Sequence, residues 1–352
     1  MSIVFDEAYY QALMKENGYD PVAFGKINFG LGSLVQEDLQ RRWLCHHNAD
    51  EFARRFAAGE ESIVTSGFGM SGVPHAGTIS QILRSIALQK AGVPVQLVMG
   101  DLDAYNGKGT DLGYALELAD KFQQFITNLG FKTDDGSILR GQINAGDVAI
   151  TAQLIAKYMD EGMFAAAEED LHSFYAEKGK VDDTPGMSFP RRMSLNLMVA
   201  DFIDLYRNSG IPNVLVMLGI DEHQYVRFAQ ETVRRMQEDG QLDGYSLGGL
   251  YSSLIKGFFD FPKMSKSFPN SGITADLPAE EIQRRIKEGE GESTRPEDNV
   301  VYQLMASAST LSPQELAVNY DACLQGGPAW QKSKAAYTDM LVNICSKWPG
   351  GD

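Results

Sequence analysis

Two lysines and two hydroxyl side chains lie within five residues, in the segment Lys263-Met264-Ser265-Lys266-Ser267. Pro262 and Pro269 flank this segment, so we expect a loop rather than a helix or strand. A mobile loop with two ammonium groups can bring positive charge to a phosphate group that is being transferred. An ordinary solvated run of charge would not predict the intervening methionine or the paired serines. The segment therefore predicts a phosphate-binding loop.

A second candidate for phosphate chemistry is the glycine-rich segment 66–78. Gly67, Gly69 and Gly77 let the backbone approach a ligand closely, and the segment leads into a predicted helix whose first N–H groups attract anions. His75 lies just before that helix, where its ring could donate to a phosphate oxygen. The spacing is neither that of a dinucleotide fingerprint nor that of a P-loop. The alternative is a tight glycine turn with a surface histidine.

The elements around these segments predict an α/β fold. A short strand at 62–65, a helix from 78 to about 90 and a buried, β-branched strand at 93–99 form a βαβ unit, which implies a parallel sheet. The sequence after the last proline-flanked loop is acidic and helical. The other expected elements are helices at 111–129, around 147–174, at 194–207 and at 225–236, and a strand at 213–218.

Several segments receive simpler interpretations. Residues 1–60 are expected to be mostly helical, because apolar residues recur at helical spacing in 39–56. The glycine-rich stretch 244–257 is expected to be a loop near the site or a connection. Packing residues are expected at Tyr9, Tyr10 and Trp43, and surface histidines at His172 and His223.

Composition narrows the class of protein. The chain has 352 residues, 43% hydrophobic and 22% charged, which is ordinary for a globular protein. Its formal net charge of -16 argues against a surface coated with basic residues for nucleic acid, although a local basic stripe stays possible under physiological screening. There is no long apolar run and no signal peptide pattern. We therefore expect a soluble, cytoplasmic protein without a membrane span.

Cysteine usage gives no sign of a structural metal or a disulfide framework. Cys45, Cys323 and Cys345 are widely spaced and odd in number. The run Cys45-His46-His47 lacks further ligands at workable spacing for a zinc site. We expect no metal bound by protein ligands.

The two phosphate-binding candidates together resemble the signature motifs of class I aminoacyl-tRNA synthetases. Residues 263–267 match the KMSKS signature in all five places, and His75-Ala76-Gly77-Thr78 is similar to the HIGH-type motif. Further segments resemble the tryptophanyl type: 66–72 looks like its "TGxxPSG" lead-in, with Met70 for Pro. The segments 100–104, 197–203 and 219–222 look like its "ADLHA", "LMAADIL" and "GxDQ" elements.

The resemblance implies a fold and a set of site residues. The fold is a doubly wound parallel sheet, Rossmann-like and of the HUP type, with a helical C-terminal part. Its division is a helical N-terminal extension (1–60), a catalytic domain (61–262) with an insertion near 130–190, and the signature loop with a helical C-terminal region (263–352). The implied catalytic residues are His75, Thr78, Lys263 and Lys266. The implied ATP-binding residues are Gly67, Gly69, Gly77, Gly219, Asp221, Met264, Ser265 and Ser267, and the implied amino-acid-binding residues are Asp101, Tyr105, Met198 and Asp201.

The resemblance also implies a reaction. ATP with Mg²⁺ would activate an amino acid, tryptophan by the Met198 and Asp201 pattern, for transfer to tRNA, and the family suggests a homodimer. Asp103 stands where the family has His, and Glu222 where it has Gln.

Three alternatives stay open: a paralogue that adenylates an amino acid for another acceptor, a non-catalytic amino-acid or nucleotide sensor, and an adenylyl transferase. The residues alone also allow Asp201 to be a simple buried acceptor.

Overall fold

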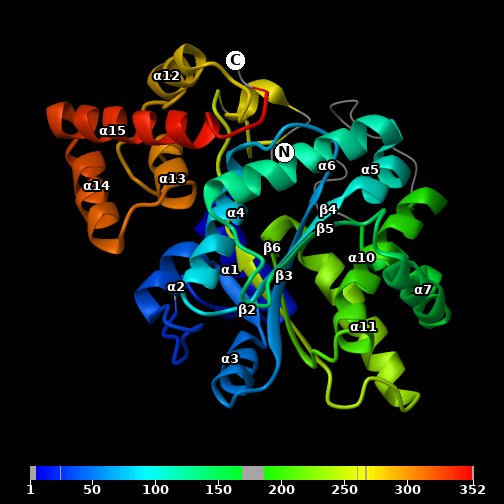
Figure 1. Cartoon of the computed structure of the whole chain (residues 1–352). Coiled ribbons are helices and arrows are strands. Elements are labelled where there is room, and N and C mark those ends of the chain that lie inside the picture. Colours follow the sequence, from blue (N-terminus) through cyan, green and yellow to red (C-terminus); the bar gives the residue numbers. More distant parts are fainter. Residues whose placement is uncertain (1–4, 24, 169–185, 260, 266–267, 351–352) are drawn as a thin grey trace.

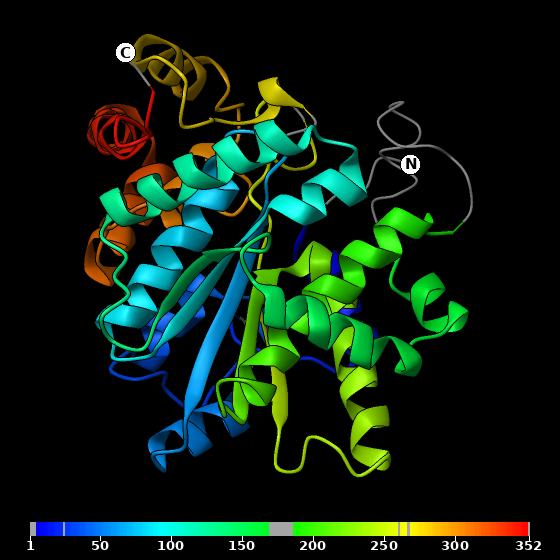
Figure 2. The ribbon, with the colours of Figure 1, turned by 45° about the vertical axis from the view of Figure 1, so that its right-hand side comes forward.

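The computed structural model describes residues 5–23, 25–168, 186–259, 261–265 and 268–350. Within these residues, a sheet of seven strands has the order β1-β2-β7-β6-β3-β4-β5. Helices cover both faces of the sheet, and the C-terminal helices form a separate group beside one face (Figures 1 and 2). The expected doubly wound α/β sheet with a helical C-terminal part is confirmed.

The parallel part of the sheet contains β3 (Ser62–Gly69), β4 (Val95–Gly100), β5 (Ile138–Gly141), β6 (Asn213–Gly219) and β7 (Ser246–Ser252). The chain first adds β4 and β5 on one side of β3 and then returns to add β6 and β7 on the other side. The strand order therefore reverses between β3 and β6. In open α/β sheets, ligands bind outside the carboxyl ends of the strands at such a point.

Burial on both faces explains the apolar runs of the central strands. In β6, Leu215 and Met217 join the core under α4 (Ala76–Lys90) and α6 (Leu112–Leu129). Val214 and Val216 join a second core, beneath helices on the opposite face. A strand covered on both sides has no polar face, so it lacks the alternation of a half-exposed strand. This pattern makes β3, β4 and β6 recognisable from the sequence.

Most predicted helices are present with shifted ends. The expected helix at 111–129 is α6, whose first turn is capped by the Asp111 side chain and whose last turn ends at Gly130 with φ of 107°. The structure replaces the broad helical stretch around 147–174 with shorter pieces as far as it is described. The elements of this part of the chain are α5 (Asp101–Lys108), α7 (Gly146–Ile155), η1 (Ala156–Tyr158), α8 (Glu161–Ala166), α10 (Phe189–Arg207), η2 (Ile220–Glu222) and α11 (His223–Glu238).

The N-terminal segment is not wholly helical, which corrects the expectation for 1–60. It contains α1 (Glu7–Asn17), α2 (Gln36–Arg42) and α3 (Ala49–Ala57), but also β1 (Asp20–Pro21) and β2 (Cys45–His47). Strand β2 pairs antiparallel with β7 and β1 pairs antiparallel with β2. Tertiary pairing thus overrides the helical spacing of 39–56, and the segment completes the edge of the sheet.

Residues 246–252 of the glycine-rich stretch 244–257 form strand β7, which corrects the expectation of a loop or connection for that part, whereas 253–257 have no regular secondary structure. Two glycines of the strand lie close to neighbouring atoms. A Cβ atom at Gly248 would lie 3.0 Å from the backbone oxygen of His47, and one at Gly249 would lie 2.3 Å from the Tyr251 hydroxyl. Glycine in this strand therefore signals a close approach rather than a turn.

The C-terminal region is helical, as expected. It comprises η3 (Pro269–Ser271), α12 (Ala279–Glu288), α13 (Val300–Ser307), α14 (Pro313–Gln325) and α15 (Gly327–Cys345). After α15 the chain returns to the sheet domain, where the buried Trp348 packs edge-on against Phe122 and Phe125 of α6. This contact joins the end of the described chain to a helix that covers the sheet. No described helix is long and apolar enough to cross a membrane.

Replacing Trp348 by Ala should lower the free energy of unfolding by about 3–5 kcal/mol, because the change leaves a large cavity against two phenylalanine rings. Urea unfolding measures this loss. Val318→Ala, on the exposed side of α14, is the control and should change stability by less than about 0.5 kcal/mol. Equal unfolding midpoints for the two variants would show that the C-terminal end does not stabilise the domain.

Candidate active site

The glycine turn joins β3 to α4 at the point where the strand order reverses. His75 caps α4, and its Nδ1 accepts a hydrogen bond from the Gly77 N–H at 3.0 Å. A Cβ atom on Gly77 would lie 2.7 Å from the His75 ring, so only glycine fits under this ring. Thr78 is buried in the next position. One of the helix N–H groups expected to face a phosphate is therefore held by His75 in this structure.

The segment after the lysine loop pairs with this turn through the backbone. The Ala76 N–H donates to the Ile273 carbonyl at 2.8 Å, and the Ala275 N–H donates to the Pro74 carbonyl at 2.9 Å. His75 and Thr274 form the bridge between these two bonds. The glycine turn and the strand-like segment 273–275 thus lie side by side, although they are far apart in the sequence.

The first residue of the lysine loop, Lys263, contacts a residue that follows the end of β6. The Lys263 ammonium forms an ion pair with Asp221 Oδ2, and both side chains are mostly buried. Met264 is buried and its N–H donates to the Ile255 carbonyl at 3.0 Å, while the Ser265 N–H donates to Ser271 Oγ at 3.0 Å. Lys266 and Ser267 lie outside the described residues. Both described flanks of the loop therefore meet the carboxyl edge of the sheet.

Gly219 is the last residue of β6, and Asp221 follows it closely. Asp221 lies in the short helix η2, and a Cβ atom on Gly219 would lie 2.6 Å from Asp221 Oδ1. The absence of a side chain at 219 allows the carboxylate to turn back over the strand end, where it meets Lys263. The structure therefore brings together the turn, the described part of the loop and the β6 end, as the sequence motifs predict.

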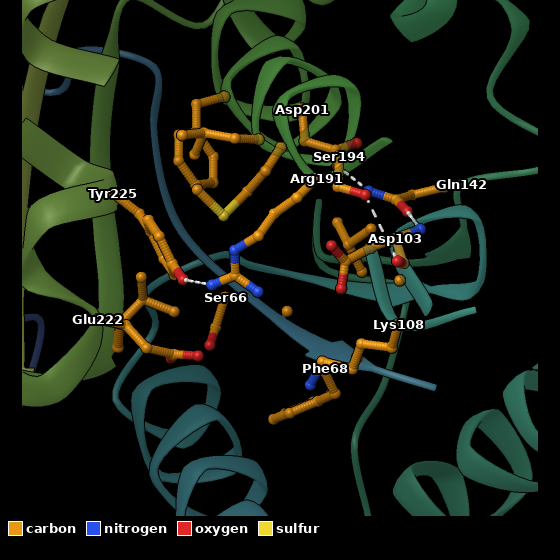
Figure 3. Close-up of a pocket in the computed structure, with 18 of the residues that line it drawn as sticks. Ser66, Phe68, Asp103, Lys108, Gln142, Arg191, Ser194, Asp201, Glu222 and Tyr225 are labelled. Carbon is orange, nitrogen blue, oxygen red and sulfur yellow. Dashed lines mark hydrogen bonds between the residues drawn. The ribbon is translucent and has the colours of Figure 1, made fainter. Parts of the chain in front are cut away.

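A pocket of about 140 Å³ opens beside this edge (Figure 3). The predicted residues Gly67, Gly69, Met198 and Asp201 line it. The remaining lining residues are partly apolar and partly charged. The apolar lining includes Phe68, Val98, Leu195, Phe202 and Leu218, and the charged lining includes Asp103, Lys108, Arg191 and Glu222.

A buried polar network forms the floor of the pocket around Asp201. Its Oδ1 pairs with Arg140 Nη2 at 2.6 Å, and its Oδ2 accepts from Gln142 Nε2 at 2.9 Å. Gln142 Oε1 in turn accepts from the Asp103 N–H at 3.1 Å. Burial raises the pKa of the Asp201 carboxyl, while Arg140 and Gln142 act in the opposite direction. Asp201 is thus both a pocket residue and the anchor of two neighbours that sequence analysis missed.

Two predicted amino-acid-binding residues do not line the pocket. Asp101 is buried, and its Oδ1 accepts from the backbone N–H groups of Leu102 at 2.7 Å and Ile143 at 3.0 Å. One oxygen of its carboxylate therefore fixes the connection after β4, while the other, Oδ2, is buried without a hydrogen-bond partner among the described residues. Tyr105 lies on α5, is 48% exposed and does not line this pocket.

His223 is also placed differently from the surface position that we expected. It is buried, and its Nδ1 lies 2.8 Å from the Tyr19 hydroxyl. His172 lies outside the described residues. The expected packing roles of Tyr10 and Trp43 are confirmed by their burial, and the Tyr10 hydroxyl accepts a hydrogen bond from the Leu254 N–H at 3.1 Å.

Charged residues of the pocket wall were also missed as site residues. Lys108 ends α5, and Arg191 lies in the first turn of α10, where its Nη2 donates to the Tyr225 hydroxyl at 2.7 Å. Neither belongs to a motif, and the only signal in the sequence is a cation close to a predicted strand or helix end. Among the described residues, no group of three or more His, Cys, Asp or Glu side chains is arranged to hold a metal ion.

The fold and the described part of the site together resemble those of class I aminoacyl-tRNA synthetases. A doubly wound sheet carries a His-capped glycine turn at its switch point, and a KMSKS-type segment is held against it from both described sides.

Comparisons with known proteins agree, although no protein-family model matches the chain. The sequence is 26% identical to tryptophan–tRNA ligase of Aeropyrum pernix over 284 residues, which is 79% of this chain and 71% of that protein. The crystal structure of the tryptophanyl-tRNA synthetase from Aeropyrum pernix superposes with a TM-score of 0.77 at 20% identity, covering 97% of this chain and 92% of that one.

Two further solved structures extend the comparison. Tryptophanyl-tRNA synthetase from Encephalitozoon cuniculi, bound to tryptophan, gives a TM-score of 0.74 at 17% identity, over 98% of this chain and 94% of that one. Tyrosyl-tRNA synthetase from Archaeoglobus fulgidus gives 0.66 at 20% identity, over 86% and 95%. The resemblance to the tryptophanyl and tyrosyl subclass is thereby confirmed, and the comparisons indicate a class I aminoacyl-tRNA synthetase ligase.

Replacing Arg140 by Met should destabilise the protein by about 3–5 kcal/mol at pH 7.5, because it leaves the buried Asp201 carboxylate without its cation. Burial already raises the pKa of Asp201, and losing Arg140 raises it further. Lowering the pH to 5 favours protonation of Asp201, which removes the uncompensated charge, and should therefore shrink the difference from the unaltered protein.

Urea unfolding at the two pH values measures this effect. Arg234→Met is the matched control, because Arg234 pairs with Glu231 and Glu238 on an exposed helix face and should cost less than about 1 kcal/mol at either pH. A loss for Arg140→Met that stays the same at both pH values would contradict a buried, ionised Asp201.

Proposed function

We propose that the chain activates an amino acid with ATP and transfers it to tRNA, as a tryptophanyl-tRNA synthetase-like enzyme. The observation that supports this most directly is the pairing of the glycine turn with the segment after the lysine loop. This pairing brings the glycine turn and the segment after the lysine loop together at the switch point of the sheet, where a nucleotide is expected. The choice of tryptophan and tRNA as substrates in this proposal follows the names of the similar proteins, a tryptophan–tRNA ligase and a tryptophanyl-tRNA synthetase bound to tryptophan.

In the proposed reaction, an oxygen of the amino acid carboxylate attacks the α-phosphorus of ATP in line. A new bond joins this oxygen to phosphorus, and the bond from the α-phosphorus to the bridging oxygen breaks. Its electron pair leaves with pyrophosphate. The carboxylate is already ionised at neutral pH, so no side chain needs to remove a proton. Catalysis then consists of positioning and stabilisation of charge.

Each predicted residue has a part in this scheme. Gly67, Gly69 and Gly77 leave room for the nucleotide, and His75 and Thr78 act beside the phosphates. Gly219 and Asp221 accommodate the ribose, and Lys263 and Lys266 stabilise the pyrophosphate leaving group. Met264, Ser265 and Ser267 shape the loop around these lysines.

Tryptophan is the amino acid we propose for the pocket over Met198 and Asp201. Met198 and the apolar lining suit an aromatic side chain. The carboxylate of Asp201 is an acceptor for a ring N–H, and its bonds to Arg140 and Gln142 fix its orientation. Asp101 and Tyr105 have no part in this proposal, because they lie outside the pocket.

Mg²⁺ would accompany ATP and be held mainly by phosphate oxygens, which suits its preference for oxygen ligands. It would supply neutralising charge on the phosphates. A homodimer stays a prediction of the resemblance, and a cytoplasmic location stays a prediction of the composition.

A non-tRNA acceptor is the alternative. The formal net charge of -16 favours it, because the phosphates of tRNA are repelled by an acidic surface. Activation would proceed as proposed, and only the second transfer would differ.

Lys263→Ala should lower the rate of ATP–pyrophosphate exchange roughly 10²- to 10³-fold, because it removes one cation from the developing charge on the leaving group. Binding of the amino acid, measured by calorimetry, should change little. Lys256→Ala, an exposed lysine shortly before the loop, is the control and should retain full exchange. Exchange that survives Lys263→Ala would remove this lysine from the mechanism.

The decisive experiment is ATP–pyrophosphate exchange with each of the twenty amino acids in turn, followed by aminoacylation of total tRNA. We expect exchange with tryptophan above all others and a labelled tRNA product. Exchange without a tRNA product would favour the alternative acceptor. If no amino acid supports exchange, the chain is not an activating enzyme, and binding alone would then indicate a sensor.

A further inference from the structure

Arg191 places a permanent positive charge inside the pocket. It lies in the first turn of α10, and its half-buried side chain extends from the helix across the pocket towards Ser66 (Figure 3). The Tyr225 hydroxyl accepts one of its N–H groups at 2.7 Å. A guanidinium cannot lose its charge at any accessible pH and carries five donors in a fixed plane. The geometry suits the binding of a carboxylate.

The neighbouring arginine points in another direction, as successive residues of a helix do. Arg192 turns away from the pocket, where it pairs with the exposed Glu161 and donates from Nε to the Met187 carbonyl at 2.8 Å. A cation in the first turn of a helix is unfavourable, because the helix dipole is positive there. Both Arg191 and Arg192 carry this unfavourable interaction with the helix dipole, but of the two only Arg191 lines the pocket.

Ser66 supplies a second, independent observation. It is the residue of β3 just before Gly67, its side chain is 2% exposed, and it lines the pocket. Its Oγ has no hydrogen-bond partner among the described residues. A buried hydroxyl without a partner costs free energy and calls for a ligand or another explanation. Ser66 therefore offers an O–H donor beside the guanidinium.

We propose that Arg191 and Ser66 form the subsite for the α-carboxylate of the amino acid, a proposal that rests on the proposed function. The two residues line the same pocket as Met198, Asp201 and the glycines Gly67 and Gly69, and Figure 3 shows the Arg191 side chain reaching towards Ser66. If the side chain of the amino acid lies over Met198 and the α-phosphate lies over the glycine turn, its carboxylate lies in this pocket within reach of both residues.

This subsite would serve the attack on phosphorus. A carboxylate and a triphosphate are both anionic, so their approach is repulsive without a cation between them. The guanidinium and the Ser66 hydroxyl can hold one carboxylate oxygen, which leaves the second oxygen directed at the α-phosphate. Arg191 is thus a catalytic residue that contacts the substrate, and Tyr225 is a positioning residue that fixes the guanidinium.

The test compares an amino acid with its amino alcohol, which lacks only the carboxylate. The probe pair is L-tryptophan and L-tryptophanol, or the corresponding pair for whichever amino acid gives the highest pyrophosphate exchange. Calorimetry should show that Arg191→Gln weakens binding of the amino acid roughly 10- to 100-fold and leaves the amino alcohol nearly unchanged. In exchange assays, the KM for the amino acid should rise and kcat should fall, with the KM for ATP preserved.

Two further variants provide a matched control and a second test of the subsite. Arg192→Gln removes the same charge from the same helical turn and should preserve the difference between the two ligands. Ser66→Ala should weaken the amino acid about tenfold without lowering the melting temperature, because the hydroxyl has no partner to lose within the described residues.

The outcomes separate this proposal from the proposed function. If exchange is present but Arg191→Gln weakens the amino acid and the amino alcohol equally, Arg191 contacts the side chain and the carboxylate subsite is wrong. Unchanged binding of both ligands overturns it as well. Absence of exchange with every amino acid, in the unaltered protein, contradicts the proposed function and this subsite together.

Discussion

The backbone pairing between residues 74–76 and 273–275 is the contact on which the site depends. Its two hydrogen bonds are 2.8 Å and 2.9 Å long and involve no side chain, so they hold the two segments together whatever the loop lysines do. Because one partner begins α4 and the other follows the lysine loop, a change in either segment moves both phosphate-binding candidates. The helical C-terminal region begins only a few residues later, so its packing also bears on this pairing.

In the described part of the site, the charges of Lys263 and Asp221 balance each other in an ion pair. Each side chain is 16% exposed, so the two charges lie in a partly desolvated place where an unpaired charge would be costly. Under the proposed function, ATP offers phosphates to Lys263 and ribose hydroxyls to Asp221. Binding of the nucleotide would then replace the ion pair by two contacts, one from Lys263 to the phosphates and one from Asp221 to the ribose. Neither charged side chain would lose its partner when ATP binds.

The fold was largely predictable because its central strands are apolar on both faces and are separated by glycine turns. β3, β4 and β6 and the helices between them were recognised for this reason. The errors have a common physical cause. β5 and β7 are short or rich in glycine, and β1 and β2 lie in a segment with helical spacing, so only pairing with neighbouring strands makes them strands. Such pairing joins distant segments and leaves no local pattern.

The two sides of the proposed site also differ in how far they could be predicted from the sequence. The proposed phosphate side of the site is built from continuous segments. His75, Gly77 and Lys263 were therefore predicted from local residue patterns and Asp221 from the family resemblance, and the structure pairs the glycine turn with 273–275 and Lys263 with Asp221. The amino-acid side is assembled from single residues on separate elements. Arg140 and Gln142 matter only because Asp201 anchors them, and Arg191 matters only because α10 directs it inward while Arg192 faces Glu161. A reaction common to many enzymes needs a fixed phosphate geometry, whereas the choice of amino acid depends on side chains that tertiary packing alone assembles.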